Sequence, residues 1–306
     1  MNRLGFLAAG IGSLLAAAPM PPFRELEERF GGRLGVFAVD LGTGKQVEHR
    51  ANERFPMCST FKLLAVAAIL KRVRNGEDRL SRSIPYTSEN ILKYAPVTQR
   101  HLDAAGNGSM TLGELCAAAI EWSDNTAANL LLEELGGPVG VTDFAFSMGD
   151  SRTRLDRTEP ELNTALPGDP RDTTTPASMA NDLRELVFGN VLGRQSRMLR
   201  AWMLNCQTAA GGIPAGLPRG WTSGNKTGSG GYATANDVAF LIPPQGAPKI
   251  VAAYYTRSRA TPSQQDAILA DVARIVTRYF TSRDVTAAQF MFAKNDSMYL
   301  PRSLGL

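Results

Sequence analysis

The chain has 306 residues, with 33 lysines and arginines against 29 aspartates and glutamates, which gives a formal net charge of +4 at pH 7. Hydrophobic residues make up 43% of the chain, which is typical of a globular protein and excludes a disordered or fibrous one. No dense basic run with interleaved aromatic residues occurs, so nucleic acid is not a predicted partner.

The scarce residue types argue against two kinds of site. The three cysteines and two histidines form no CxxC or HxxxH pair, so neither a Cys/His zinc site nor any other metal or cofactor is expected. A Ser-His-Asp triad would depend on His49 or His101. If the chain is a hydrolase, we expect its general base to be another residue type.

The N-terminus has the pattern of a secretory signal peptide. Residues 4–18 are uncharged and mostly apolar, follow Arg3, and end in three alanines before a proline-rich break. The alternative is an uncleaved membrane anchor, but 15 residues fall short of the roughly 20 that span a bilayer. We therefore expect residues 1–18 to be removed, the protein to be secreted to the bacterial periplasm, and no membrane association after cleavage.

The remaining chain predicts strands near both ends and helices between them. The expected helices cover residues 22–31, 59–73 and 262–280, with mostly helical pieces over 81–205, and the expected strands cover 34–40, 45–50, 221–227, 237–242 and 249–256. This order predicts an α/β two-subdomain (α+β) fold, in which an antiparallel sheet packed with the terminal helices is interrupted by an all-helical subdomain. The predicted single unit is 19–280, with 19–58 and 206–280 in the α/β subdomain and 59–205 in the helical one. Residues 281–306 form an extension of unknown role.

Ser59 and Lys62 form an S-x-x-K motif at the start of the predicted apolar helix. Residues i and i+3 share a helix face, so the lysine amine can lie beside the serine hydroxyl, near the free N–H groups of the helix N-terminus. Taken alone, an N-cap serine with a solvated lysine is the commoner explanation.

A second and a third motif follow between the helical pieces. Ser123 and Asn125 belong to an S-D-N motif, in which a hydroxyl and an amide can face one cleft; a helix N-cap is the structural alternative. Glu159 and Asn163 belong to E-P-E-L-N, where Pro160 disfavours helix at Glu159 and a carboxylate and an amide could hold one water; a charged surface loop is the alternative.

The fourth motif is K-T-G-S, formed by Lys226, Thr227, Gly228 and Ser229 on a late predicted strand. A cation beside two hydroxyls suits a carboxylate ligand, and the glycine permits close approach to the backbone. An edge strand with a charged end is equally compatible with this short stretch.

All four motifs occur in this order in one chain, which coincidence does not explain. The set resembles the class A serine β-lactamases, for which S-x-x-K, S-D-N and K-T-G are diagnostic. Longer blocks extend the resemblance over about residues 22–280, among them MCSTFK, SDNTAANLL, RTEPELN, GDPRDTTTP and KTGSGGYATAND. The last block resembles the extended-spectrum, cephalosporin-active branches. The implied fold is that of serine β-lactamases and penicillin-binding proteins.

The resemblance implies a role for each matching residue. Ser59 would open the β-lactam amide of a penicillin or cephalosporin to an acyl-enzyme, after Lys62, or Glu159 through a water, removes its proton. Ser123 would relay a proton to the leaving nitrogen and Asn125 would hold the side-chain amide of the substrate. Glu159, with Asn163 fixing a water, would drive deacylation.

The same resemblance assigns binding and structural positions. The backbone N–H groups of Ser59 and Ser229 would form an oxyanion hole. The implied carboxylate-binding residues are Lys226, Thr227 and Ser229, Tyr94 is the implied aromatic at the cleft entrance, and Arg157 with Asp172 is the implied ion pair that closes the loop carrying Glu159.

Two departures from the family pattern stand out. Cys116 matches half of a disulfide found in some members, but its partner position is Val66, so we expect no bridge; Cys58 is expected to be a buried, unreactive side chain. An arginine that reinforces carboxylate binding in many relatives is replaced by Ala235. Unless Arg257, Arg259 or Arg219 substitutes for it, we expect weaker carboxylate binding and a raised KM.

Two other functions share part of the pattern. A penicillin-binding DD-peptidase lacks the deacylating glutamate, and a non-catalytic penicillin sensor is fused to membrane spans. We expect a monomer that acts on a small-molecule β-lactam. The ranking of β-lactam classes, the response to clavulanate and the identity of the acylation base stay open.

Overall fold

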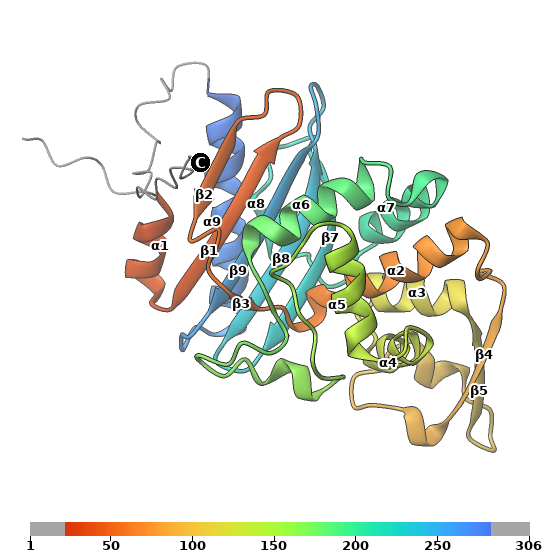
Figure 1. Ribbon diagram of the computed structural model, residues 1–306. Coiled ribbons are helices and arrows are strands. Elements are labelled where there is room, and N and C mark those ends of the chain that lie inside the picture. Colours follow the sequence, from red (N-terminus) through yellow and green to blue (C-terminus); the bar gives the residue numbers. More distant parts are fainter. Residues whose placement is uncertain (1–21, 283–306) are drawn as a thin grey trace, which may run out of the picture.

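The computed structural model describes residues 22–282, and the chain folds there into a central sheet with helices on both faces (Figure 1). The predicted signal peptide and residues 283–306 of the predicted extension lie outside the described residues. No helix among residues 22–282 is both long enough and apolar enough to cross a membrane.

The main sheet has five strands in the order β2-β1-β9-β8-β7, and all neighbours pair antiparallel. The strands are β1 (Arg33–Asp40), β2 (Gln46–His49), β7 (Thr222–Gly230), β8 (Thr234–Ile242) and β9 (Lys249–Thr256). Strands from both ends of the chain therefore lie side by side, as the sequence predicts. Because β7 is an edge strand, one side of its backbone is free to face a ligand.

The two faces of the sheet bury separate hydrophobic clusters, because successive strand residues point to opposite faces. On β9, Val251, Ala253 and Tyr255 pack with the helices α1 (Pro22–Phe30) and α9 (Pro262–Thr281). Ile250 and Tyr254 point the other way, into a larger cluster that continues through α6 (Pro176–Val187) and α2 (Phe61–Asn75). This larger cluster joins the sheet to the helical part of the molecule.

The helical part surrounds α2, whose first ten residues are all buried. Its sequence contains a nearly continuous apolar run, as expected for a helix that is covered on all sides. The other helices of this part are α3 (Leu112–Glu121), α4 (Asn125–Glu134), α5 (Pro138–Ser147) and α7 (Ser196–Leu204), whereas the short α8 (Ile213–Gly216) packs with α9 on the far face of the sheet. The division of the chain at 58/59 and 205/206 stays a prediction.

The structure adds strands that the sequence analysis missed. A hairpin of β4 (Ser83–Thr87) and β5 (Asn107–Thr111) lies within the part predicted as all-helical. Each strand buries only every second residue and is five residues long, so its signal is weaker than that of the neighbouring helices. The sequence predicted mostly helical pieces over 81–205, and only the description of the inserted subdomain as all-helical is corrected by this hairpin.

A second small sheet helps to position the candidate site. Strand β3 (Phe55–Pro56), directly before the S-x-x-K motif, pairs with β6 (Thr173–Thr174) at the end of the loop that carries Glu159. The backbone N–H of Met57 also donates to the carbonyl of Asp172 at 2.9 Å. Two segments more than 100 residues apart in sequence are thereby fixed side by side.

Candidate active site

Ser59 lies in the 3-10 turn η1 (Cys58–Thr60), at the N-terminal end of α2. Cys58 before it has the left-handed φ of +45°, a conformation that costs free energy for a residue other than glycine and is often found at functional sites. The hydroxyl of Thr60 donates to the carbonyl of Met57 at 2.8 Å and lies 3.1 Å from the hydroxyl of Tyr254 on β9. The turn is therefore anchored to the sheet.

Strand β7 passes close to this turn, and a glycine makes the approach feasible. A Cβ atom at Gly228 would lie 2.7 Å from the carbonyl oxygen of Met57 and 3.2 Å from the backbone nitrogen of Ser59. Any other residue would push the K-T-G-S segment away from the serine. The predicted close approach at Gly228 is thus to the protein's own backbone.

Lys62 is fully buried and binds three different oxygen groups. Its Nζ lies 2.9 Å from Glu159 Oε1, 2.6 Å from Asn125 Oδ1 and 2.8 Å from the carbonyl oxygen of Ser123. Burial lowers the pKa of Lys62 below its usual range, and the carboxylate of Glu159 opposes that shift. The amine therefore connects the S-D-N and E-P-E-L-N segments to α2.

The Ser59 hydroxyl donates to Glu159 Oε1 at 3.2 Å. The sequence suggested that it would lie beside the Lys62 amine, but in the described structure the two groups meet through the carboxylate oxygen that both contact. Glu159 and Lys62 have side-chain exposures of 0%, so their ion pair is shielded from water. A buried pair of this kind is costly to break from either side.

Ser123 lies between the two motif lysines. Its Oγ accepts from Lys226 Nζ at 2.9 Å and from Lys62 Nζ at 3.4 Å, and its backbone has a φ of +58°. Complete burial, together with repulsion from Lys62, lowers the pKa of Lys226 to about 7. Asp124 caps α4 by accepting from the backbone of Ala127, so the S-D-N motif serves as a helix cap as well.

The loop that carries Glu159 is held at several points. Arg157 Nε lies 2.6 Å from Asp172 Oδ2, and Asp172 Oδ1 accepts from the backbone N–H of Arg157 at 2.9 Å. Asn163 Nδ2 donates to Glu159 Oε2. The predicted ion pair and the predicted Glu159–Asn163 neighbourhood are therefore present.

Asn129 is a positioning residue that the sequence analysis missed. Its side-chain amide accepts from the backbone N–H of Glu159 at 2.9 Å and donates to the carbonyl of the same residue at 2.9 Å. It lies one helical turn after Asn125 on α4, so a search for polar residues at i+4 from the motif could have identified it.

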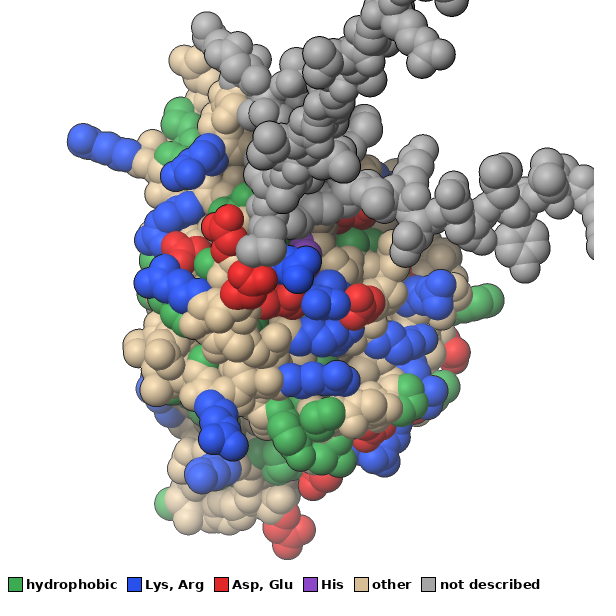
Figure 2. All heavy atoms as spheres, turned by 90° about the vertical axis from the view of Figure 1, so that its left-hand side faces the viewer, with side chains coloured by type: hydrophobic (Ala, Val, Ile, Leu, Met, Phe, Trp, Pro, Cys, Tyr) green, Lys and Arg blue, Asp and Glu red, His purple; other side chains and the backbone are tan. Residues whose placement is uncertain are grey.

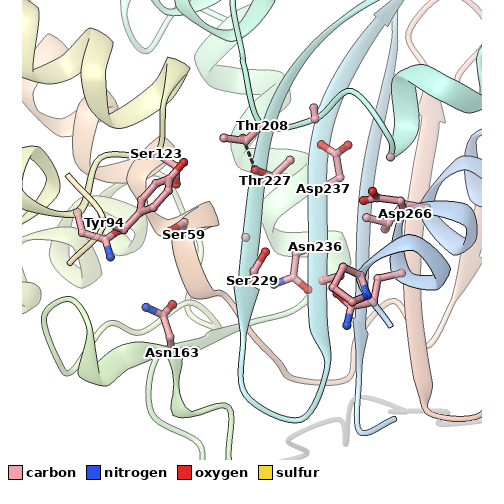
Figure 3. Close-up of a pocket in the computed structure, with 18 residues that line it drawn as sticks. Ser59, Tyr94, Ser123, Asn163, Thr208, Thr227, Ser229, Asn236, Asp237 and Asp266 are labelled. Carbon is pink, nitrogen blue, oxygen red and sulfur yellow. Dashed lines mark hydrogen bonds between the residues drawn. The ribbon is translucent and has the colours of Figure 1, made fainter. Parts of the chain in front are cut away.

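A cavity of about 400 Å³ opens in front of Ser59 (Figure 3). Tyr94, Ser123 and Asn163 border one side of it, and β7, β8 and the start of α9 form the other. In the described part of the chain no lysine or arginine belongs to its lining, and Arg257 contributes to a different cavity. The lining residues are Ser59, Tyr94, Ser123, Asn125, Asn163, Thr208, Ala209, Gly212, Thr227, Gly228, Ser229, Ala235, Asn236, Asp237, Pro262, Gln265, Asp266 and Leu269.

Several of these lining residues were not predicted. Thr208 Oγ1 lies 2.5 Å from Thr227 Oγ1, which fixes the hydroxyl of the K-T-G-S motif. Asp237 on β8 accepts from Asn225 at 2.9 Å, and its burial raises its pKa to about 7. Asp237 ends the quoted KTGSGGYATAND block but belongs to none of the four short motifs, and Thr208 lies outside all of the quoted blocks, so only the folded structure identifies both as lining residues.

The cysteines and histidines do not form a site. Among residues 22–282 no group of three or more histidine, cysteine or acidic side chains could hold a metal ion. Cys58, Cys116 and Cys206 are all free thiols, and Cys58 and Cys116 are buried. Burial raises the pKa of Cys58 far above its usual range, so it stays a protonated thiol, as expected.

Known proteins share this arrangement over most of the chain. The model of the "Beta-lactamase enzyme family" matches residues 21–280. The chain belongs to this family. β-Lactamase CTX-M-25 of Escherichia coli is 46% identical to this chain, over 88% of this chain and 94% of its own length. β-Lactamase AST-1 of Nocardia asteroides is 49% identical, over 85% of this chain and 83% of its own length.

Solved structures agree with the family model. An ancestral (GNCA) class A β-lactamase superposes with a TM-score of 0.81 at 52% identity, covering 84% of this chain and 98% of that one. The chain is accordingly a class A member of the β-lactamase family, with its two-subdomain fold. It hydrolyses β-lactams and thereby confers antibiotic resistance, and the comparisons do not favour the DD-peptidase or sensor alternative.

Proposed function

We propose that this β-lactamase acts on penicillins and cephalosporins through an acyl-enzyme on Ser59. The observation that carries the proposal is the buried Glu159 carboxylate, which contacts both the Ser59 hydroxyl and the Lys62 amine. The serine Oγ forms a bond to the lactam carbonyl carbon, the C–N bond of the ring breaks, and the serine proton passes to the Lys62–Glu159 pair.

The ring nitrogen must receive a proton when it leaves. Ser123 is suited to deliver it, because its hydroxyl accepts from Lys226 at 2.9 Å and lies within reach of Lys62. Two lysines directed at one oxygen leave its own proton free to point into the cavity. Asn125, which also lines the cavity, would hold the side-chain amide of the substrate.

The developing oxyanion would be bound by the backbone N–H groups of Ser59 and Ser229. Support comes from the place of Ser59 at the N-terminal end of α2, where N–H groups lack helical partners, and from the free edge of β7. Removing one such donor typically costs about 3–4 kcal/mol of transition-state stabilisation.

Deacylation would be driven by Glu159. A water held by Glu159 and Asn163 attacks the ester carbon, Glu159 takes its proton, and the bond to Ser59 Oγ breaks as that oxygen is reprotonated. The hydrogen bond from Asn163 to Glu159, and the cavity position of Asn163, support this role.

The carboxylate of the substrate would be received by Lys226, Thr227 and Ser229. Thr227 and Ser229 line the cavity, while Lys226 lies buried behind them with its amine on Ser123. Tyr94, 48% exposed, lies at the cavity edge and would contact the substrate on entry. We further propose a monomer secreted to the periplasm, since the family members act on diffusible small molecules.

Nitrocefin mixed with the purified protein tests the reaction. Repeated turnover is expected, because Glu159 lies where a deacylating base is needed; one stoichiometric burst followed by no further turnover would contradict the proposal. Glu159→Gln should retain acylation and accumulate acyl-enzyme that intact-protein mass spectrometry detects, with kcat reduced by about 10²–10⁴-fold.

The matched control is Glu161→Gln, since Glu161 lies two residues away on the same loop and is exposed. This variant should hydrolyse nitrocefin at the wild-type rate. If Glu159→Gln also does so, the proposed role of Glu159 is wrong.

A further inference from the structure

The loop that carries Glu159 has a second cavity on its other side, of about 130 Å³. It is bounded by this loop, by the segment before β3 and by the adjoining ends of β1 and β9. Five arginines and a single carboxylate belong to its lining: Arg33, Arg54, Arg157, Arg171, Arg257 and Asp169. A small cavity with this charge is suited to an anion.

Three of the arginines already have acidic partners. Arg33 binds Glu53 at 2.6 Å and Arg171 binds Asp169 at 2.8 Å, while Arg157 binds Asp172 as described above. The guanidinium of Arg33 also stacks 3.8 Å from the ring centroid of Phe55. These partners hold the guanidinium groups in place before any ligand arrives, which lowers the entropic cost of binding.

The remaining two arginines supply uncompensated charge. Arg54 donates only to uncharged oxygens, the carbonyl of Arg152 at 2.6 Å and the hydroxyl of Thr173 at 3.0 Å. Arg257 is exposed, has a left-handed φ of +61°, and within residues 22–282 neither it nor Arg54 forms an ion pair. Counted with the carboxylates of Glu53, Asp169 and Asp172, the arginines leave an excess of two positive charges at this cavity.

We propose that this arginine-lined cavity binds a tetrahedral oxyanion, a free phosphate or the phosphoryl group of a small ester. Guanidinium groups match phosphoryl oxygens in geometry as well as charge, and two excess charges match a dianion. The volume fits a phosphoryl group with little else, so free phosphate is the favoured ligand.

Such a ligand would act on the loop that holds the deacylating machinery. The 3-10 turn η4 (Glu161–Thr164) borders both cavities: Asn163 lines the one at Ser59, and Leu162 before it lines the arginine-lined cavity. An anion that ties Arg54 and Arg257 to the loop would favour its closed form and stabilise the native protein.

The test is thermal unfolding in phosphate against chloride at equal ionic strength, with glycerol 1-phosphate as a second arm. Inorganic phosphate should raise Tm beyond chloride, by about 3–5 °C at ten times its dissociation constant, and the shift should keep growing with the logarithm of the phosphate concentration. Equal or tighter binding of glycerol 1-phosphate would assign the site to phosphate esters, and its absence would assign it to free phosphate.

Arg257→Gln tests the location: among residues 22–282 the Arg257 side chain forms no hydrogen bond or ion pair, so the variant is expected to fold. Its phosphate affinity, measured by isothermal titration, should fall at least fivefold, while Arg259→Gln, an exposed arginine two residues away and outside the cavity, should bind like the wild type. The proposal is overturned if phosphate raises Tm no more than chloride does, or if both variants bind phosphate as the wild type does. Binding is read without a β-lactam, so the result is independent of the proposed reaction.

Discussion

Lys226 combines a ligand role with an unusual protonation equilibrium. Its amine is fully buried, and among residues 22–282 no lysine or arginine lines the cavity itself, so we expect a substrate carboxylate to depend on the charge of Lys226. A lysine with a pKa of about 7 is cationic below that pH and neutral above it. Carboxylate binding should therefore weaken as the pH rises through neutrality.

We predict that KM for benzylpenicillin increases by about tenfold between pH 6 and pH 8, following the charged fraction of Lys226. Steady-state kinetics over this range measure it. Lys226→Arg should flatten the profile, because a guanidinium stays charged, and Lys226→Ala should raise KM at both pH values. A Lys226→Ala variant with unchanged kcat/KM would exclude Lys226 from carboxylate binding.

At this scale the sequence predicts the residues that carry a motif and misses those that support them. Ser59, Lys62, Ser123 and Glu159 were predicted from spacing and family resemblance, and the structure links them in one chain of contacts that runs from Ser59 through Glu159 and Lys62 to Ser123. Asn129 lies one helical turn after Asn125 of the S-D-N motif, but the motif does not show that its side-chain amide meets the backbone of Glu159, which only the folded loop brings there.

At the scale of single elements, the position of the loop that carries Glu159 depends on the carboxylate of Asp172. Asp172 is completely buried, binds Arg157 and accepts from two backbone N–H groups at 2.8 and 2.9 Å, despite a φ of +55°. Arg157→Gln removes the charge partner and leaves the buried carboxylate uncompensated, which should displace the loop.

We predict that Arg157→Gln lowers kcat by about 10–100-fold, through slower deacylation, because small displacements of a catalytic group have effects of that size. Single-turnover mass spectrometry should detect a longer-lived acyl-enzyme. Arg154→Gln is the control, since Arg154 pairs with Asp156 at the exposed start of the same loop. Equal kcat values for the two variants would contradict the prediction.

Helix α6 carries a buried acid, Asp182, whose raised pKa lowers the stability of the native protein at neutral pH. Burial, with the neighbouring carboxyl of Asp150, raises the pKa of Asp182 to about 9. The native state therefore holds a proton at pH 7 that the unfolded state releases, so the stability contributed by Asp182 falls as the pH rises from about 4 to about 9.

We predict that Asp182→Asn raises Tm by about 2–4 °C at pH 8 and changes it little at pH 4, where the acid is neutral in both states. Calorimetry at the two pH values measures this difference. Asp143→Asn, at an exposed position of α5, should change Tm equally little at both. A lower Tm for Asp182→Asn than for the wild type at pH 8 would contradict the prediction, because the carboxyl group of Asp182 would then stabilise the native state at that pH.

The bounds of elements with a long apolar stretch were predicted to within a few residues. Short elements were missed, and glycine-rich ends of strands were predicted too short. Strand β9 lies where 249–256 was predicted, whereas β7 continues to Gly230 through glycines and a serine that gave no strand signal. It is completed by tertiary pairing with β8, in which Ser229 faces Ala235.

At the scale of the whole molecule, the sequence predicts that strands from the two parts of the chain share one sheet. It does not predict the hydrogen bonds and ion pairs that attach α1 to that sheet. Glu27 on α1 accepts from the backbone N–H of Leu34 on β1 at 2.7 Å and pairs with Arg50 after β2 at 2.9 Å. The face that carries α1 and β2 shows basic and acidic side chains next to one another (Figure 2). Only the folded arrangement brings these residues together.

We predict that Glu27 contributes to acid stability. Its burial would raise its pKa, but the His49 ring 3.3 Å away and the hydrogen bonds from Arg50 and Leu34 outweigh that effect and lower the pKa to about 2. A carboxylate with a depressed native pKa stabilises the fold above its unfolded pKa of about 4.5, and this contribution is lost as the pH falls towards 2. Discounted for the partial exposure of the group, the loss is about 1–2 kcal/mol.

Denaturant unfolding at pH 5 and pH 2.5 measures this contribution. Glu27→Gln should be less stable than the wild type at pH 5 and closer to it at pH 2.5, because Glu27 of the unfolded wild type has bound a proton by then while the native carboxylate is still mostly ionised. Glu25→Gln, on the exposed side of the same helix, should follow the wild type at both. If the free-energy gap between Glu27→Gln and the wild type is the same at the two pH values, the ion-pair network does not fasten α1 to the sheet through its charge.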